Sequence, residues 1–130
     1  PALIERDWEE RTRMILRRDG LVGWSPSVPT LSGTVRIAPE TPAGAPAPGA
    51  ARALGRLVAL TAGAVRAVSG VDDLNVCLFV SGPGDIGSYH WHADIFPRRG
   101  TLAGLELGSG ALTMTRMPEE VARAIRAALT

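Results

Sequence analysis

The sequence predicts a single α+β domain over residues 1–130, in which about two helices pack on an antiparallel sheet. Three observations predict this class. Short segments with apolar residues are separated by turn residues, as in antiparallel strands. Residues 50–69 and 118–129 instead carry apolar groups at helical spacing. The length suits one hydrophobic core, and no internal repeat is visible.

Three strands are expected in the first third of the chain. Residues 11–20 read as a strand that ends in an Asp-Gly turn, and residues 21–26 as its partner. Residues 33–39 form the third strand, because Val35 and Ile37 alternate with polar neighbours.

A Pro/Ala/Gly segment at about 39–50 follows, and it is predicted to be a flexible loop because nothing in it can pack. The helix over 50–69 comes next. Residues 74–81, LNVCLFVS, form a near-continuous apolar run that favours a central strand. Cys77 lies inside this run, so we expect it to be a buried, inert thiol.

The last part of the chain is predicted to contain two further strands and a helix. Residues 89–97 form a strand that Pro97 stops, and residues 110–116 form a short last strand. The helix over 118–129 begins with Pro118 and two glutamates, which suit a helix N-terminus.

Composition excludes several kinds of chemistry and partner. The net charge of +1 does not suggest a nucleic-acid or membrane partner. All fourteen cationic residues are arginine, so Schiff-base chemistry and a phosphate-loop lysine are excluded. No signal peptide or membrane-spanning run is visible, and a single cysteine suits a reducing compartment. The expected location is the cytoplasm.

Both histidines lie in one predicted strand, two residues apart. Because side chains alternate along a strand, His90, His92 and Asp94 share one face. Three interpretations are open: an ordinary solvated face, a metal site, or nucleophilic catalysis by an imidazole. The opposite, apolar face suits packing against a helix and carries Tyr89, Trp91, Ala93 and Ile95.

The metal interpretation has a specific form, because Gly84 and the two histidines have the spacing of a cupin motif. That motif next requires a glutamate, where this chain has Phe96 and Pro97, and another histidine, which is absent. Asp94 or Glu106 could complete only a weak site. No cofactor is therefore expected, and a divalent metal at the two histidines remains as an alternative.

Two segments resemble a known family. Residues 90–98 read His-Trp-His-Ala-Asp-Ile-Phe-Pro-Arg, and residues 103–110 read Ala-Gly-Leu-Glu-Leu-Gly-Ser-Gly, followed by the Pro-Glu-Glu helix. This pattern resembles the C-terminal half of galactose-1-phosphate uridylyltransferase-like proteins in the histidine-triad superfamily. The resemblance implies a half-barrel of antiparallel strands with a long helix and a C-terminal helix. Such units normally pair, as a homodimer or as two halves of one chain.

The resemblance also implies roles for residues at matching positions. His92 would attack the α-phosphorus of a nucleotide sugar or related phosphoanhydride, and His90 would support it or bind metal. Asp94 occupies the third position of the triad. Glu106 matches the glutamate that contacts hexose hydroxyls. The candidates on the phosphate side are Ser88, Arg98 and Ser109.

The chain departs from this family in one important respect. The catalytic His-Pro-His motif of the uridylyltransferases lies in their first half, and this chain contains no such motif. The alternative is therefore a non-catalytic half that binds nucleotide or sugar and completes a partner's site. A metal-dependent, cupin-like enzyme is the third possibility. Trp24 and Trp91 are assigned to the core rather than to base stacking.

Overall fold

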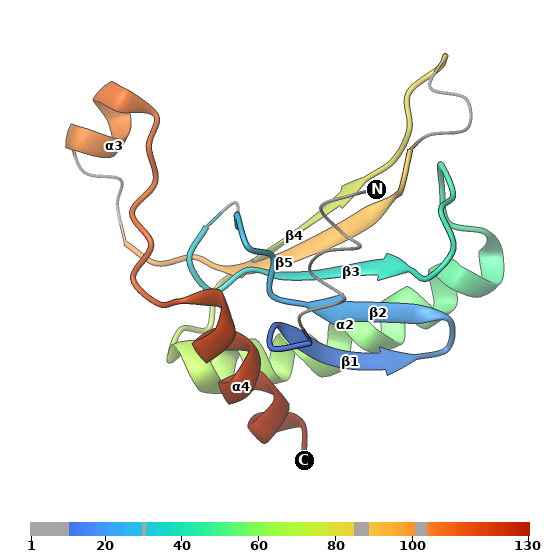
Figure 1. Cartoon of the computed structure of the whole chain (residues 1–130), viewed down its shortest axis with the longest axis horizontal. Helices are drawn as coiled ribbons and strands as arrows, with labels where there is room; N and C mark the ends of the chain where they lie inside the picture. Colours follow the sequence, from blue (N-terminus) through green and yellow to red (C-terminus); the bar gives the residue numbers. More distant parts are fainter. Residues whose placement is uncertain (1–10, 30, 85–88, 101–103) are drawn as a thin grey trace.

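The computed structural model describes residues 11–29, 31–84, 89–100 and 104–130 (Figure 1). Its five strands form one antiparallel sheet in the order β1-β2-β3-β5-β4, which confirms the predicted α+β class. The strands are β1 (Met14–Arg18), β2 (Leu21–Trp24), β3 (Val35–Pro39), β4 (Leu74–Phe79) and β5 (His92–Pro97). The helices are α2 (Pro48–Ser69), α3 (Gly104–Ser109) and α4 (Pro118–Leu129).

The long helix α2 forms as the apolar spacing predicts. Pro48 occupies its first turn, where a missing N–H costs nothing. Gly70 ends the helix with a φ of 69°, a left-handed conformation that favours glycine. Its N–H donates to the carbonyl of Arg66 at 2.8 Å. The buried face of α2 consists of Ala53, Leu57, Thr61, Ala64 and Val65.

The main core lies between one face of the sheet and the helices α2 and α4. In Figure 1, α2 runs behind the strands and α4 lies in front of one end of α2. Val35, Ile37 and Ile95 supply its sheet side. A second, smaller cluster of Val22, Trp24 and Ala38 lies on the opposite face of the sheet. Trp24 and Trp91 are both buried, which confirms that they belong to the core. None of the described helices is long and apolar enough to cross a membrane.

Strand β4 is an edge strand, so the prediction of a central strand is wrong. Its side chains are largely exposed, and Cys77 is exposed as well, which overturns the prediction of a buried thiol. An apolar run such as residues 74–81 is typical of a strand that is covered on both faces. The described part of this chain, however, supplies no element to cover it. Val76, Leu78 and Val80 are 50%, 50% and 45% exposed.

The predicted strand over 110–116 is wrong, because this segment pairs with none of the described strands. Hydrogen bonds to Ser32, which precedes β3, hold this segment instead. Ser32 Oγ lies 3.0 Å from Thr115 Oγ1 and accepts from the Thr115 N–H at 3.2 Å. The short helix α3, which the sequence did not predict, stands away from the sheet at the end of this segment (Figure 1).

The Pro/Ala/Gly segment predicted as a loop at about 39–50 is a loop up to Ala47, where helix α2 begins. It also makes defined contacts. The carbonyls of Ala43 and Gly44 accept hydrogen bonds from the N–H groups of Trp91 and Ser81, at 2.9 and 2.8 Å. The loop is therefore attached to the segments on either side of the β4–β5 connection.

Candidate functional site

The centre of the candidate site is the start of β5. This strand pairs with β3 on one side and with β4 on the other. Ala93 and Ile95 face the helices and are fully buried, so His92 and Asp94 lie on the opposite face. The strand begins at His92, and His90 lies just before it in the loop. The structure therefore brings His92 and Asp94 to one face, as predicted. The predicted strand start at residue 89 is wrong, because residues 89–91 lie before β5, so His90 is not part of this alternating face.

Backbone carbonyls fix the tautomers of both imidazoles. A carbonyl can only accept, so the ring nitrogen bonded to it carries the proton. His90 Nε2 donates to the carbonyl of Pro39 at 2.6 Å. His92 Nδ1 donates to the carbonyl of His90 at 3.2 Å. Neutral His92 therefore presents a lone pair on Nε2, and no described residue forms a hydrogen bond with that atom.

The ring of His92 is held on its other side by β4. Phe79, which is its cross-strand partner, stacks on the imidazole with ring centres 4.7 Å apart and planes 16° from parallel. Partial burial has the largest effect and lowers the pKa of His92, and the hydrogen bond to His90, which is the next largest, raises it. The charge of Arg36 lowers the pKa, and the smaller effect of the Asp94 charge raises it. His92 is therefore neutral at pH 7, the form that a nucleophile requires.

Asp94 forms an ion pair with Arg36 of β3, its cross-strand partner. Nε and Nη2 of Arg36 each donate to one carboxylate oxygen at 2.7 Å. The Asp94 side chain is 0% exposed, whereas that of Arg36 is 23% exposed. Sequence reasoning missed Arg36. The alternation of Val35 and Ile37 already placed Arg36 on the opposite face, but the register that sets it beside Asp94 is not a local property of the sequence.

The remaining candidates are not gathered at His92. Arg98 follows β5, and Glu106 and Ser109 belong to α3, so they lie beyond the other end of the strand (Figure 1). Six residues of strand separate the two ends by roughly 16 Å. Glu106 Oε1 accepts from the Thr113 N–H at 3.2 Å, and Ser109 Oγ donates to the carbonyl of Leu105 at 2.6 Å. Ser88 lies outside the described residues.

A metal site receives little support from the geometry. Within the described residues, no group of three or more His, Cys, Asp and Glu side chains is arranged to hold a metal ion. A cupin is also a double-sheet fold. The described part of this chain instead forms a single sheet backed by helices, so the cupin-like alternative is wrong in its fold.

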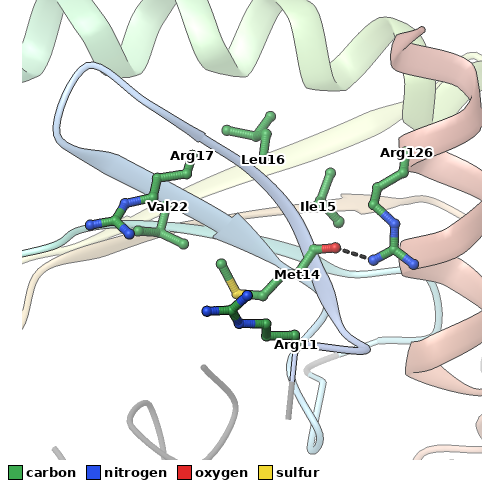
Figure 2. Close-up of a pocket in the computed structure, with 7 residues that line it drawn as sticks. All are labelled: Arg11, Met14, Ile15, Leu16, Arg17, Val22 and Arg126. Atoms are coloured by element: carbon green, nitrogen blue, oxygen red, sulfur yellow. Dashed lines mark hydrogen bonds between the residues drawn. The ribbon is translucent and has the colours of Figure 1, made fainter. Parts of the chain in front are cut away.

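A cavity of about 560 Å³ lies at the opposite edge of the sheet, over β1 (Figure 2). Its apolar lining comes from Met14, Leu16 and Val22, together with Ile15. The guanidinium of Arg126 donates to the carbonyl of Met14, as the dashed line in Figure 2 shows, and to that of Thr12. Arg126 thus occupies backbone acceptors at the β1 edge. The cavity itself is separate from the histidines, because β1 and β5 are not neighbours in the sheet.

Comparison with known proteins identifies the fold. No family model and no curated protein matches the sequence. Among solved structures, a uridylyltransferase mutant matches with a TM-score of 0.83 and 24% identity, covering 98% of this chain and 46% of the other. An ADP-glucose phosphorylase from Arabidopsis thaliana, solved with ADP-glucose, matches with a TM-score of 0.82 and 21% identity, covering 96% and 42%.

A Hit-like protein from Bartonella henselae matches with a TM-score of 0.68 and 22% identity, covering 89% of this chain and 85% of the other. The fold is therefore the histidine-triad fold, as the sequence resemblance implied. The TM-scores are higher for the uridylyltransferase mutant and the ADP-glucose phosphorylase than for the Hit-like protein. This chain spans less than half the length of the first two.

Proposed function

We propose that this chain is a nucleotidyltransferase or nucleotide phosphohydrolase that acts on a nucleotide sugar or a related phosphoanhydride. The Nε2 lone pair of His92 attacks the α-phosphorus, a P–N bond forms, and the bond to the leaving phosphate oxygen breaks. That oxygen departs with the bonding electrons. A sugar phosphate or water then attacks the same phosphorus and releases the histidine.

One observation carries this proposal: His92 donates through Nδ1 to a backbone carbonyl, which leaves Nε2 as the unprotonated atom. The lowered pKa of His92 keeps that atom available at neutral pH. The fold supports the same class of chemistry, because its solved neighbours include a uridylyltransferase and an ADP-glucose phosphorylase. His90 supports the nucleophile through its carbonyl, and its own ring is fixed by Pro39.

The proposed partner is a second triad-like unit that pairs along β4. This edge exposes Val76, Leu78 and Val80. An unpaired apolar edge strand favours association, whereas the β1 edge has backbone carbonyls bonded to Arg126. A second unit would also explain why the remaining candidate substrate-binding residues do not lie near His92. Glu106 for the sugar hydroxyls, and Arg98, Ser109 and Ser88 for phosphate, would then complete a site shared between units.

A reducing location such as the cytoplasm fits the exposed thiol of Cys77, the single cysteine of the chain. In a reducing compartment the thiol does not form intermolecular disulfides, and the proposed partner unit would cover it.

The test is the intact mass of the protein after brief incubation with a panel of nucleotide sugars. Reactions are quenched at alkaline pH, because a phosphorus–nitrogen bond to histidine is labile in acid. We expect a mass gain of one nucleotide in the wild type and in His90→Gln at lower yield, and none in His92→Gln. A gain that persists in His92→Gln would disprove the assignment of the nucleophile.

The alternative is a non-catalytic half that binds nucleotide or sugar and completes a partner's site. The observation that favours it is the environment of Asp94, whose carboxylate is bonded to Arg36 on both oxygens. The third position of the triad is therefore already occupied by a structural ion pair. This alternative expects the same ligands to bind, with no nucleotide mass gain for any member of the panel.

A further inference from the structure

A second polar side chain reaches the face of the sheet that carries His92. Arg36 lies opposite Asp94 in the β3–β5 register, and His92 lies two residues before Asp94 on the same face. Arg36 is thus a diagonal neighbour of His92, and such residues lie roughly 7–8 Å apart, with their Cβ atoms somewhat closer. We propose that Arg36 binds the phosphate group that is presented to His92, and that Asp94 is the positioning residue that holds Arg36. This inference rests on the proposed function.

The ion pair leaves Arg36 with unused donors. A guanidinium has five N–H groups, and the two bonds to Asp94 use one on Nε and one on Nη2. Arg36 makes no further hydrogen bond to the described residues. Its side chain is 23% exposed, so a ligand can reach the remaining N–H groups. Arginine donors of this kind suit the oxygens of a phosphate.

The pair is also oriented for an anion. The Asp94 side chain is 0% exposed whereas that of Arg36 is 23% exposed, so the arginine is the partner that a ligand can approach. The effect of the pair at His92 agrees with this orientation. Arg36 lowers the pKa of His92 by more than Asp94 raises it, so the net potential of the pair at the imidazole is positive. A buried carboxylate that fixes an arginine in advance also removes the cost of ordering it during binding.

The test measures binding of inorganic pyrophosphate to the full chain, by calorimetry and by the ring signals of ¹³C-labelled His92. The variant is the double substitution Arg36→Gln with Asp94→Asn, which replaces the ion pair with a neutral amide pair and leaves no unpaired buried charge. The matched control is Arg123→Gln, an exposed arginine on α4. Circular dichroism confirms that each variant is folded.

We expect pyrophosphate to shift the His92 signals in the wild type and in the control with equal affinity. The double variant should bind about tenfold or more weakly, as loss of a hydrogen bond to a charged group implies. The role of Asp94 has its own readout. Asp94→Asn should lower the pKa of His92, because the Arg36 charge is no longer offset, whereas the double variant should raise it.

Equal affinity of the double variant and the wild type would overturn the proposal, as would a wild type whose His92 signals do not respond to pyrophosphate. The outcome is separable from that of the proposed function. If anion binding depends on Arg36 but no nucleotide becomes attached to His92, the covalent mechanism fails and the phosphate contact stands.

Discussion

Gly44 should not tolerate a methyl group, because the loop before α2 passes very close to the end of β4. A Cβ built on Gly44 would lie 2.5 Å from Oγ and 3.3 Å from Cβ of Ser81. The Ser81 hydroxyl can rotate away from the first contact, but its Cβ cannot move without the backbone. That backbone is held by the Ser81 N–H bond to the carbonyl of Gly44 at 2.8 Å. The substitution Gly44→Ala therefore tests whether this contact fixes the loop beside the site.

The expected loss of stability follows from two opposing effects. Overpacking of this kind costs about 1–3 kcal/mol. Replacing glycine by alanine also restricts the unfolded chain, which returns about 0.4–1 kcal/mol where the native conformation permits alanine. Gly44 is not among the glycines with positive φ, so the gain applies. The net expectation is a loss of roughly 1–2 kcal/mol in the free energy of unfolding.

Urea denaturation measures this loss, and Ser81→Gly supplies the second arm of a double-mutant cycle. In the Ser81→Gly background both close atoms are gone, so Gly44→Ala should be neutral or stabilising. Gly63→Ala in α2 is the matched control. No atom lies within 4 Å of its built Cβ, and alanine should stabilise the helix by about 1 kcal/mol.

Amide spectra extend the test to the site. The Trp91 N–H, which donates to Ala43, should shift in Gly44→Ala and should not shift in Gly63→Ala. If Gly44→Ala is as stable as the wild type, or if Ser81→Gly does not relieve its cost, then the close contact does not fix the loop and the reasoning is refuted.

Three further predictions concern His92 and β4. The pKa of folded His92 lies below its ordinary value of 6.5, so the unfolded chain binds more protons and the free energy of unfolding should fall as pH drops below about 6.5. His92→Gln should lose this part of the pH dependence in urea titrations, and an unchanged profile would contradict the burial effect. Leu78→Arg should abolish pairing along β4, measured by native mass spectrometry, whereas Arg123→Gln should not; a wild type that stays monomeric at high concentration would argue against self-pairing. Cys77 should react with a thiol reagent in the folded, unpaired chain without prior unfolding, and labelling that requires denaturant would show that it is covered.

The parts of the fold that the sequence predicted depend on local patterns. The helix α2 follows from apolar spacing, and the shared face of His92 and Asp94 follows from strand alternation. The segment 110–116 has a similar alternation and forms no strand, because a strand also needs a neighbour to pair with. The local pattern of residues therefore predicts whether a segment can form a strand, and it does not predict whether another strand lies beside that segment.

The structure of the site depends on information that is not local. Arg36 and Asp94 are 58 positions apart, and only the β3–β5 register places them together. The same holds for the carbonyl of Pro39, which fixes His90 across 51 positions. The tautomers that leave Nε2 of His92 available could not be predicted from the sequence, although the histidines themselves could be found.

The two edges of the sheet differ in how open they are to a further strand. At β1, Arg126 occupies backbone carbonyls, which discourages a further strand. At β4, the apolar side chains are open, and Phe79 of this same strand stacks on His92. A strand without support on its outer side is less firmly held, and the ring of His92 stacks on an edge strand whose side chains are largely exposed. A unit that covers β4 would steady Phe79 and thereby the imidazole, so the proposed pairing would also orient the proposed nucleophile.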